Sequence, residues 1–124
     1  MPQQPTVLVV DDQLGARELL QTILQSDYRV VVAKEGEQAI YIVEHEPMDV
    51  ILLDLHMPGL SGRQVLQKIQ AIDPSIQVIL VTGSDPYATV LEDLRPHIFD
   101  YMLKPFDVSS LRETVKQALA HRSQ

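Results

Sequence analysis

Three aspartates stand directly after runs of apolar residues, where their side chains are placed to do chemistry. Asp11 and Asp12 follow residues 6–10, and Asp54 follows residues 50–53. Carboxylates that lie close together raise one another's pKa, so a group of three needs protons or a cation as compensation. A site of oxygen ligands without a soft donor suits Mg²⁺ or Mn²⁺. The 124-residue chain has no cysteine, which excludes thiolate nucleophiles and cysteine-ligated metals.

Two more polar residues follow other apolar runs and suggest phosphoryl transfer. Thr82 stands after residues 76–81, and Lys104 stands after residues 101–103. An aspartate carboxylate can attack phosphorus as a nucleophile, and the protein around it then positions groups and neutralises charge on the phosphoryl oxygens. A hydroxyl and a lysine ammonium are suited to those oxygens. We therefore expect Asp54 to accept a phosphoryl group that the metal, Thr82 and Lys104 contact.

The apolar runs alternate with segments in which apolar residues recur at helical spacing. Short runs without polar alternation indicate strands covered on both faces, and their alternation with helices predicts an α/β fold with a parallel sheet. We expect a flavodoxin-like (βα)₅ arrangement, with strand order 2-1-3-4-5 and helices on both faces. Ligands of such sheets bind at the carboxyl ends of the strands, so the polar residues above should share one rim. The expected strands are residues 6–10, 29–33, 50–53, 76–81 and 101–103.

Capping residues mark several helix ends. Ser61 and Gln64 form a capping-box pattern at the start of the third helix. Residues 85–86, an Asp-Pro pair, predict the start of the fourth helix, because proline lacks the N–H that is unpaired there. Pro96 is expected to end that helix, and Asp107 is expected to cap the last one.

Composition and charge narrow the classes of function. Hydrophobic residues make up 45% of the chain, which is typical of a globular domain. The formal net charge of −7 argues against direct binding of nucleic acid. No stretch approaches the ~20 apolar residues of a membrane span, and the start lacks the positive charge of a signal peptide, so we expect a cytoplasmic protein with no membrane contact. We expect an N-terminal extension at residues 1–5, one domain at 6–120 and a tail or linker start at 121–124.

Together these motifs resemble the receiver domain of response regulators in two-component signalling. The resemblance covers residues 6–120 and rests on residues 9–12, 52–62, 81–83 and 100–106. It implies a signalling protein, not an enzyme beyond its own phosphorylation and dephosphorylation. The implied phosphoryl donor is a sensor histidine kinase or a phosphotransfer protein. The face formed by helix 4, strand 5 and helix 5 would then change, to control an output domain or partner or to form a homodimer.

The resemblance also implies a metal site and an acceptor. Asp54 is the implied phospho-acceptor. Asp12 would ligate Mg²⁺ directly and Asp11 largely through water, with Asp54 and the backbone carbonyl of His56 as further ligands.

Four residues carry the implied phosphoryl contacts and the switch. Thr82 and Lys104 would bind phosphoryl oxygens, and the Lys104–Pro105 peptide bond would be cis. Tyr101 stands at the aromatic switch position, where the ring turns inward when Thr82 moves toward the phosphoryl group.

Residues 95–99 depart most from the family pattern, which usually has a pair of small residues there. Pro96 is expected to shorten the fourth helix, and Phe99 to add bulk beside the fifth strand. We therefore predict a reshaped signalling face, and with it a dimer mode unlike the common one.

Three other functions compete with that of a phosphorylatable receiver. A phosphatase of the haloacid-dehalogenase type needs a second aspartate two residues after its nucleophile, but Gln13 and Leu14 stand at those positions. A flavodoxin needs a phosphate-binding loop after the first strand, where Asp11 and Asp12 would repel a phosphate. A receiver-like module that binds partners without phosphorylation remains the alternative.

Overall fold

Five parallel strands form the centre of the computed structural model, which describes residues 4–83 and 92–122. Their spatial order is β2-β1-β3-β4-β5, which confirms the predicted flavodoxin-like arrangement. The strands are β1 Thr6–Val10, β2 Arg29–Ala33, β3 Val50–Leu53, β4 Gln77–Thr82 and β5 Asp100–Leu103.

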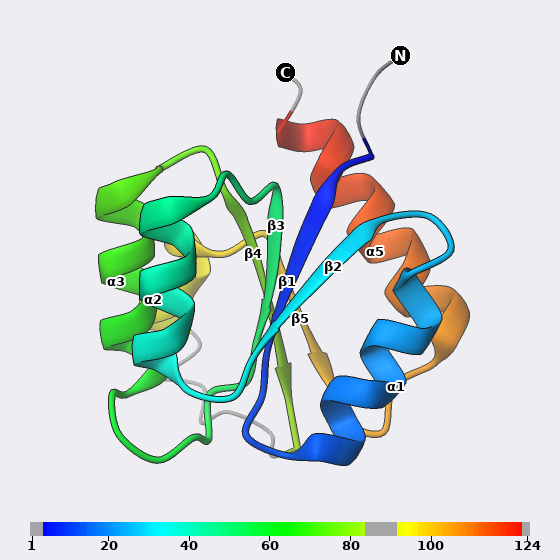
Figure 1. The fold of residues 1–124 in the computed structure, drawn as a ribbon, viewed down its shortest axis with the longest axis horizontal. Coiled ribbons are helices and arrows are strands. Elements are labelled where there is room, and N and C mark those ends of the chain that lie inside the picture. The colour runs from blue at the N-terminus through cyan, green and yellow to red at the C-terminus, as the bar shows by residue number, and fades with distance from the viewer. Residues whose placement is uncertain (1–3, 84–91, 123–124) are drawn as a thin grey trace.

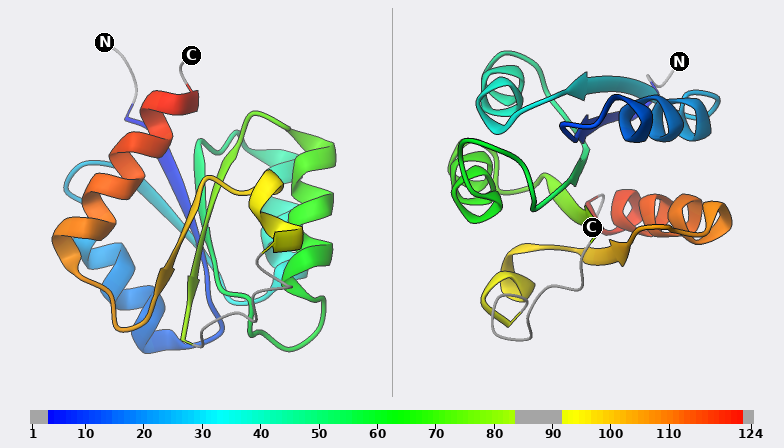
Figure 2. Two further views of the ribbon diagram at one scale, coloured as in Figure 1. Left: turned by 180° about the vertical axis from the view of Figure 1, so that it is seen from behind. Right: turned by 90° about the horizontal axis from the view of Figure 1, so that it is seen from below.

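Helices cover both faces of this sheet. Figure 1 shows α2 and α3 on one face and α1 and α5 on the other, and the view from below in Figure 2 shows the same three layers. Within the described residues, no helix has the length and apolar character needed to cross a membrane. The helices are α1 Leu14–Leu24, α2 Gly36–His45, α3 Gly62–Ile72 and α5 Val108–Arg122, with a short 3₁₀ helix η1 at Arg95–His97.

The first three strands have the predicted bounds, and the last two differ by one residue. β4 begins at Gln77 rather than Ile76. The Ile76 amide bonds to the Asp73 carbonyl in a turn (3.3 Å), whereas the Gln77 amide bonds to the backbone carbonyl of Asp49, the residue before β3 (3.2 Å). β4 also ends one residue later, so that Thr82 is its last residue. β5 begins one residue early, at Asp100, which pairs with β4.

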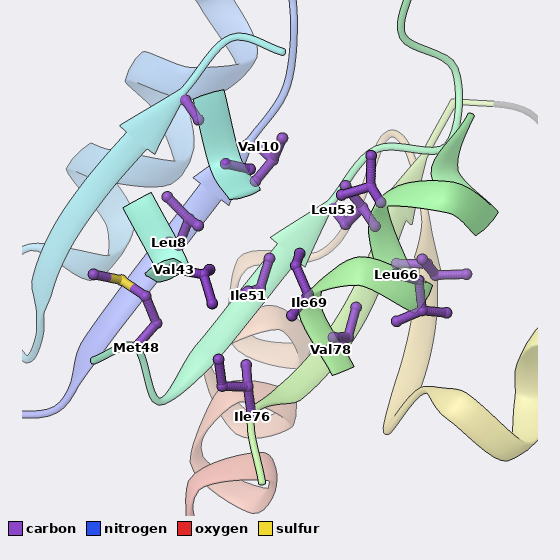
Figure 3. Packing of buried hydrophobic residues seen from close by; sticks show 14 of the residues in the cluster. Leu8, Val10, Val43, Met48, Ile51, Leu53, Leu66, Ile69, Ile76 and Val78 are labelled. Carbon is purple, nitrogen blue, oxygen red and sulfur yellow. The ribbon is translucent and has the colours of Figure 1, made fainter. Parts of the chain in front are cut away.

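Two hydrophobic clusters lie on opposite faces of the sheet, and successive residues of each strand alternate between them. Figure 3 shows the first cluster, in which Leu8 and Ile51 of the strands pack with Leu66 and Ile69 of α3. Val9 belongs to the second cluster, which packs against α1 and α5. Full burial of one such side chain contributes roughly 1.5–3 kcal/mol. Burial on both faces explains why the strands lack polar alternation in the sequence.

The predicted helix caps agree with the structure wherever it describes them. Ser61 and Gln64 form the reciprocal capping box at the start of α3. The Asp107 carboxylate accepts a hydrogen bond from the Ser110 amide (2.8 Å), which caps α5. The Asp-Pro start expected at residues 85–86 lies outside the described residues. Residues 92–94 are helical, and the α-helical pattern gives way to η1 at Arg95, one residue before Pro96.

The side chain of Phe99 packs toward the α5 layer. It joins the cluster between the sheet and helices α1 and α5, and its ring lies 5.6 Å from the ring of His121. The segment around η1 is held on the other face by α3, because Gln70 Nε2 donates to the His97 carbonyl (2.5 Å) and Arg63 pairs with Asp93. The left view of Figure 2 shows this yellow segment beside the green α3. The predicted change in dimer mode stays a prediction.

Candidate functional site

The candidate site lies at the carboxyl ends of the strands, along the lower edge of the sheet in Figure 1. β1 and β3 are neighbours, and the Asp54 amide bonds to the Val10 carbonyl (3.0 Å), which places Asp54 beside the residues that follow β1. In the same way the Lys104 amide bonds to the Thr82 carbonyl (2.8 Å). The parallel ladders therefore bring residues far apart in sequence to one rim.

Three carboxylates meet at this rim. Asp11, Asp12 and Asp54 each offer an oxygen, and these oxygens lie within 4.8 Å of one another. Asp11 and Asp54 are buried, with 2% and 5% of their surface exposed, whereas Asp12 is exposed. Two buried carboxylates and one open to solvent form an oxygen-only site of the kind that suits a hard divalent cation.

The Lys104 ammonium lies between the two buried carboxylates. Its Nζ is 2.5 Å from Asp11 Oδ2 and 3.6 Å from Asp54 Oδ2. Only 20% of the Lys104 side chain is exposed, so the attraction is screened less than that of a surface pair. One ammonium faces three carboxylates, and the site keeps an excess of negative charge.

The pKa of the Asp54 carboxyl is raised above its ordinary value of 3.8. Burial is the main cause, because it disfavours the charged form. The His56 amide, which donates to Asp54 Oδ1 (3.0 Å), and the Lys104 charge both act in the opposite direction. The nearby charges of Asp11 and Asp12 raise the pKa further. Burial and the two neighbouring carboxylates therefore outweigh the Lys104 charge and the His56 amide at Asp54.

Thr82 and Tyr101 occupy neighbouring strands. Thr82 is fully buried at the end of β4, and Tyr101 lies in β5, half-buried against the cluster that faces α2 and α3. Tyr101 also lines a cavity of about 300 Å³ together with Arg95, Pro96 and Ile98. The Lys104–Pro105 peptide bond, which follows β5, is cis, the isomer that the family resemblance implies.

Arg17 is a site residue that the sequence analysis missed. Its Nη1 donates to the backbone carbonyl of Asp11 (2.9 Å). The signal was present in the sequence, because helical side chains point back toward the helix N-terminus. A long side chain near the start of a helix therefore reaches the loop that precedes it.

Comparison with known proteins agrees with this geometry. A family model described as the response regulator receiver domain matches residues 7–116. The chain is 35% identical over 118 residues to sporulation initiation phosphotransferase F of Bacillus subtilis, covering 94% of this chain and 95% of that protein. It is 35% identical over 116 residues to the transcriptional regulatory protein ZraR of Escherichia coli, covering 93% of this chain. The match spans only 26% of the ZraR length.

Solved structures that resemble this chain include receiver domains and response regulators. The signal receiver domain of an HD domain-containing protein from Pseudomonas fluorescens superposes with a TM-score of 0.91 at 28% identity, covering 99% of this chain and 92% of that chain. The response regulator protein TrrA from Thermotoga maritima superposes with a TM-score of 0.84 at 34% identity, covering 93% of this chain and 99% of that chain. The TrrA structure is a complex with Mg²⁺-BeF.

Proposed function

The chain belongs to the response regulator receiver domain family, and on that premise we propose that Asp54 accepts a phosphoryl group from a histidine kinase or phosphotransfer protein. The observation that carries this proposal is the meeting of three carboxylates, a lysine and a buried threonine at one rim of the sheet. The protein signals through its phosphorylated state, and residues 6–120 make up the proposed domain.

The proposed reaction moves a phosphoryl group from nitrogen to oxygen. A carboxylate oxygen of Asp54 forms a bond to phosphorus while the bond from phosphorus to the donor's histidine nitrogen breaks. The electron pair of that bond stays on the imidazole nitrogen. Asp54 is buried at the rim, so a donor must present its phosphorylated histidine from the open side, where Asp12 lies exposed.

The residues at the rim fit a magnesium ion. Asp11, Asp12, Asp54 and the backbone carbonyl of His56 would hold it, and all four offer the oxygen ligands that Mg²⁺ prefers. When bound, the ion supplies positive charge that reduces repulsion between the carboxylates and an incoming phosphoryl group. The surplus of negative charge around Lys104, described above, supports this assignment. Mn²⁺ prefers the same oxygen ligands and would fit the same site.

Lys104 and Thr82 are the proposed contacts of the phosphoryl oxygens. Lys104 Nζ lies 3.6 Å from Asp54 Oδ2, so its ammonium is within reach of a group attached to that carboxylate. Thr82 would move toward the phosphoryl group and leave space that the Tyr101 ring fills by turning inward. Tyr101 is half-buried in the strand that pairs with the strand of Thr82, and this position supports such a movement.

The face that includes β5 and α5 is the proposed output surface. Its change on phosphorylation would favour binding of an output partner or of a second copy of this chain. The helix expected before η1 completes this face in the family, and its residues 84–91 lie outside the described part of the chain. The alternative is a module that binds its partner without phosphorylation.

Treatment with acetyl phosphate and Mg²⁺, followed by intact mass measurement, tests the proposal. We expect a gain of one phosphoryl group that disappears with a chelator and in the Asp54→Asn variant. Asp27→Asn is the matched control, because Asp27 is exposed in the turn after α1. No gain by the wild-type protein under any condition would favour the module that acts without phosphorylation.

A further inference from the structure

We propose that Arg17 is a positioning residue, which holds Asp11 and Asp12 in the arrangement that binds the divalent cation. This inference rests on the proposed function, because it concerns the metal site of the same reaction. Arg17 is half-buried near the start of α1, and its Nη1 donates to the Asp11 carbonyl at 2.9 Å. The guanidinium contacts the backbone of the loop and is not itself a proposed ligand of the metal.

The loop that carries both aspartates is only three residues long. Asp11, Asp12 and Gln13 connect the end of β1 to the start of α1. The Asp11 amide bonds to the Ala33 carbonyl of β2 (3.1 Å), so the loop is fixed to the sheet where it begins. Gln13 is the N-cap of α1, and its side chain makes no capping hydrogen bond. The helix end of the loop therefore depends on other contacts.

Residue 17 makes one contact on each side of Asp12, but only the side-chain contact depends on the arginine, because the backbone contact is the ordinary first hydrogen bond of α1. Its backbone amide bonds to the Gln13 carbonyl at 3.1 Å, and its side chain bonds to the Asp11 carbonyl. The Asp11 carboxylate accepts from the Gln13 amide at 3.0 Å, which closes the turn from within. Asp12 thus lies between two peptide groups that bond to residue 17, and the bond at the Asp11 carbonyl depends on the guanidinium. Loss of the guanidinium would release the Asp11 carbonyl and leave Asp12 less well placed.

A positioning role of Arg17 and a purely electrostatic effect of its charge predict opposite changes in Mg²⁺ affinity when the side chain is removed. A positive charge beside a cation site repels the cation, so its removal alone would strengthen Mg²⁺ binding. A positioning role predicts the opposite sign, because a looser loop binds the metal more weakly. Groups that orient metal ligands typically change metal affinity by about 10- to 100-fold when they are removed.

The test is the affinity for Mn²⁺, followed by the electron paramagnetic resonance signal of the free ion, with Mg²⁺ titration calorimetry as the second readout. We expect Arg17→Met, which removes both the charge and the donors but keeps an unbranched stem, to raise the Kd about tenfold. Arg17→Lys keeps the charge and a donor and should give an intermediate Kd. Arg29→Met is the matched control, because Arg29 is exposed at the start of β2, and its Kd should equal that of the wild type.

An unchanged or lower Kd in Arg17→Met would overturn the proposal. Thermal melting of each variant shows whether it is folded at the temperature of the titration. If Arg17→Met does not melt cooperatively, Arg17→Lys decides the matter, and a Kd equal to that of the wild type overturns the proposal. If the wild type binds Mn²⁺ and accepts a phosphoryl group while Arg17→Met binds the metal equally well, only the role of Arg17 fails. If the wild type binds no metal and accepts no phosphoryl group, the proposed function fails with it.

Discussion

Asp54 lies in surroundings that oppose its own negative charge. Its pKa is raised in the folded protein, chiefly by burial, so the folded state holds a proton on Asp54 more strongly than the unfolded chain does. The contribution of Asp54 to the free energy of unfolding therefore increases as the pH falls through its folded pKa. At neutral pH the ionised Asp54 carboxylate destabilises the folded state.

We therefore expect Asp54→Asn to be more stable than the wild type at neutral pH in a chelating buffer. The difference should shrink as the pH falls and vanish below the unfolded pKa, where the wild-type carboxyl is protonated in both states. Urea unfolding of the two proteins from pH 7 down to pH 3 measures this difference. A constant difference across that range would show that charge is not its cause.

Divalent cation binding should stabilise the protein through the same carboxylates. A ligand that binds only the folded state adds about 2.7 kcal/mol of stability at a concentration of 100 times its Kd. We expect saturating Mg²⁺ to raise the melting temperature of the wild type and of Asp27→Asn, and to have little effect on Asp12→Asn. An equal rise in Asp12→Asn would place the cation elsewhere.

The helix starts around the site depend on close backbone packing. A Cβ added at Gly62, the first residue of α3, would lie 2.5 Å from Leu55 Cδ2 and 3.3 Å from Leu55 Cα. Leu55 follows Asp54 directly, so this close approach ties the start of α3 to the segment that carries the proposed phospho-acceptor. Gly36 at the start of α2 is similarly crowded by Val65 of α3.

Gly62→Ala should destabilise the protein by about 1–3 kcal/mol, since the new methyl group must displace the Leu55 side chain or the backbone beside it. Gly15→Ala is the matched control, because no atom lies within 4 Å of the added Cβ in α1. There the better helix propensity of alanine should increase stability by up to about 1 kcal/mol. Urea unfolding of both variants gives the comparison, and equal effects would contradict the packing argument.

Most of the elements could be predicted from the sequence because their signals are local. The strands of the central sheet are continuous apolar runs, and the capping box of Ser61 and Gln64 is a short-range pattern. The first residue of β4 could not be predicted exactly. Ile76 is apolar and buried like a strand residue, but its amide donates to the Asp73 carbonyl within a turn. The contact of Arg17 with the Asp11 carbonyl could be predicted only from the direction in which a helical side chain points, and the spacing of apolar residues does not give that direction.

The grouping of the site residues depends on the whole sheet. The sequence predicted that Asp11, Asp12, Asp54, Thr82 and Lys104 share one rim, because parallel strands end on the same side. The pairing of the Lys104 ammonium with Asp11 at 2.5 Å, and its longer distance to Asp54, depend on side-chain packing across β1, β3 and β5. The sequence pattern therefore does not predict the distances from Lys104 to the two aspartates.

A second polar cluster lies at the opposite edge of the molecule. Arg122 in the last turn of α5 lies 3.0 Å from Asp49 Oδ1 and donates to Ser75 Oγ at 2.8 Å. Asp49 in turn accepts from the Thr6 amide at 2.8 Å. This cluster fastens α5 to the segments that begin β1, β3 and β4.

Arg122→Met should lower stability by about 1 kcal/mol, at the upper end for an ion pair near the surface, because only 23% of its side chain is exposed. Arg29→Met, which breaks a more exposed pair with Glu46, should cost less. Urea unfolding measures both, and the Mn²⁺ affinity should be unchanged in both because neither residue lies at the carboxylate rim. A changed affinity in Arg122→Met would show coupling between the two edges of the sheet.

The start of β1 and the end of α5 lie together at the edge of the sheet farthest from the aspartates (Figure 1). An affinity tag, a fluorescent label or a surface-immobilisation handle joined to either of these segments would therefore leave the rim open to approach from solution. Sensor-chip measurements of donor binding can use such handles at both positions, and agreement between the two orientations would rule out obstruction by the support.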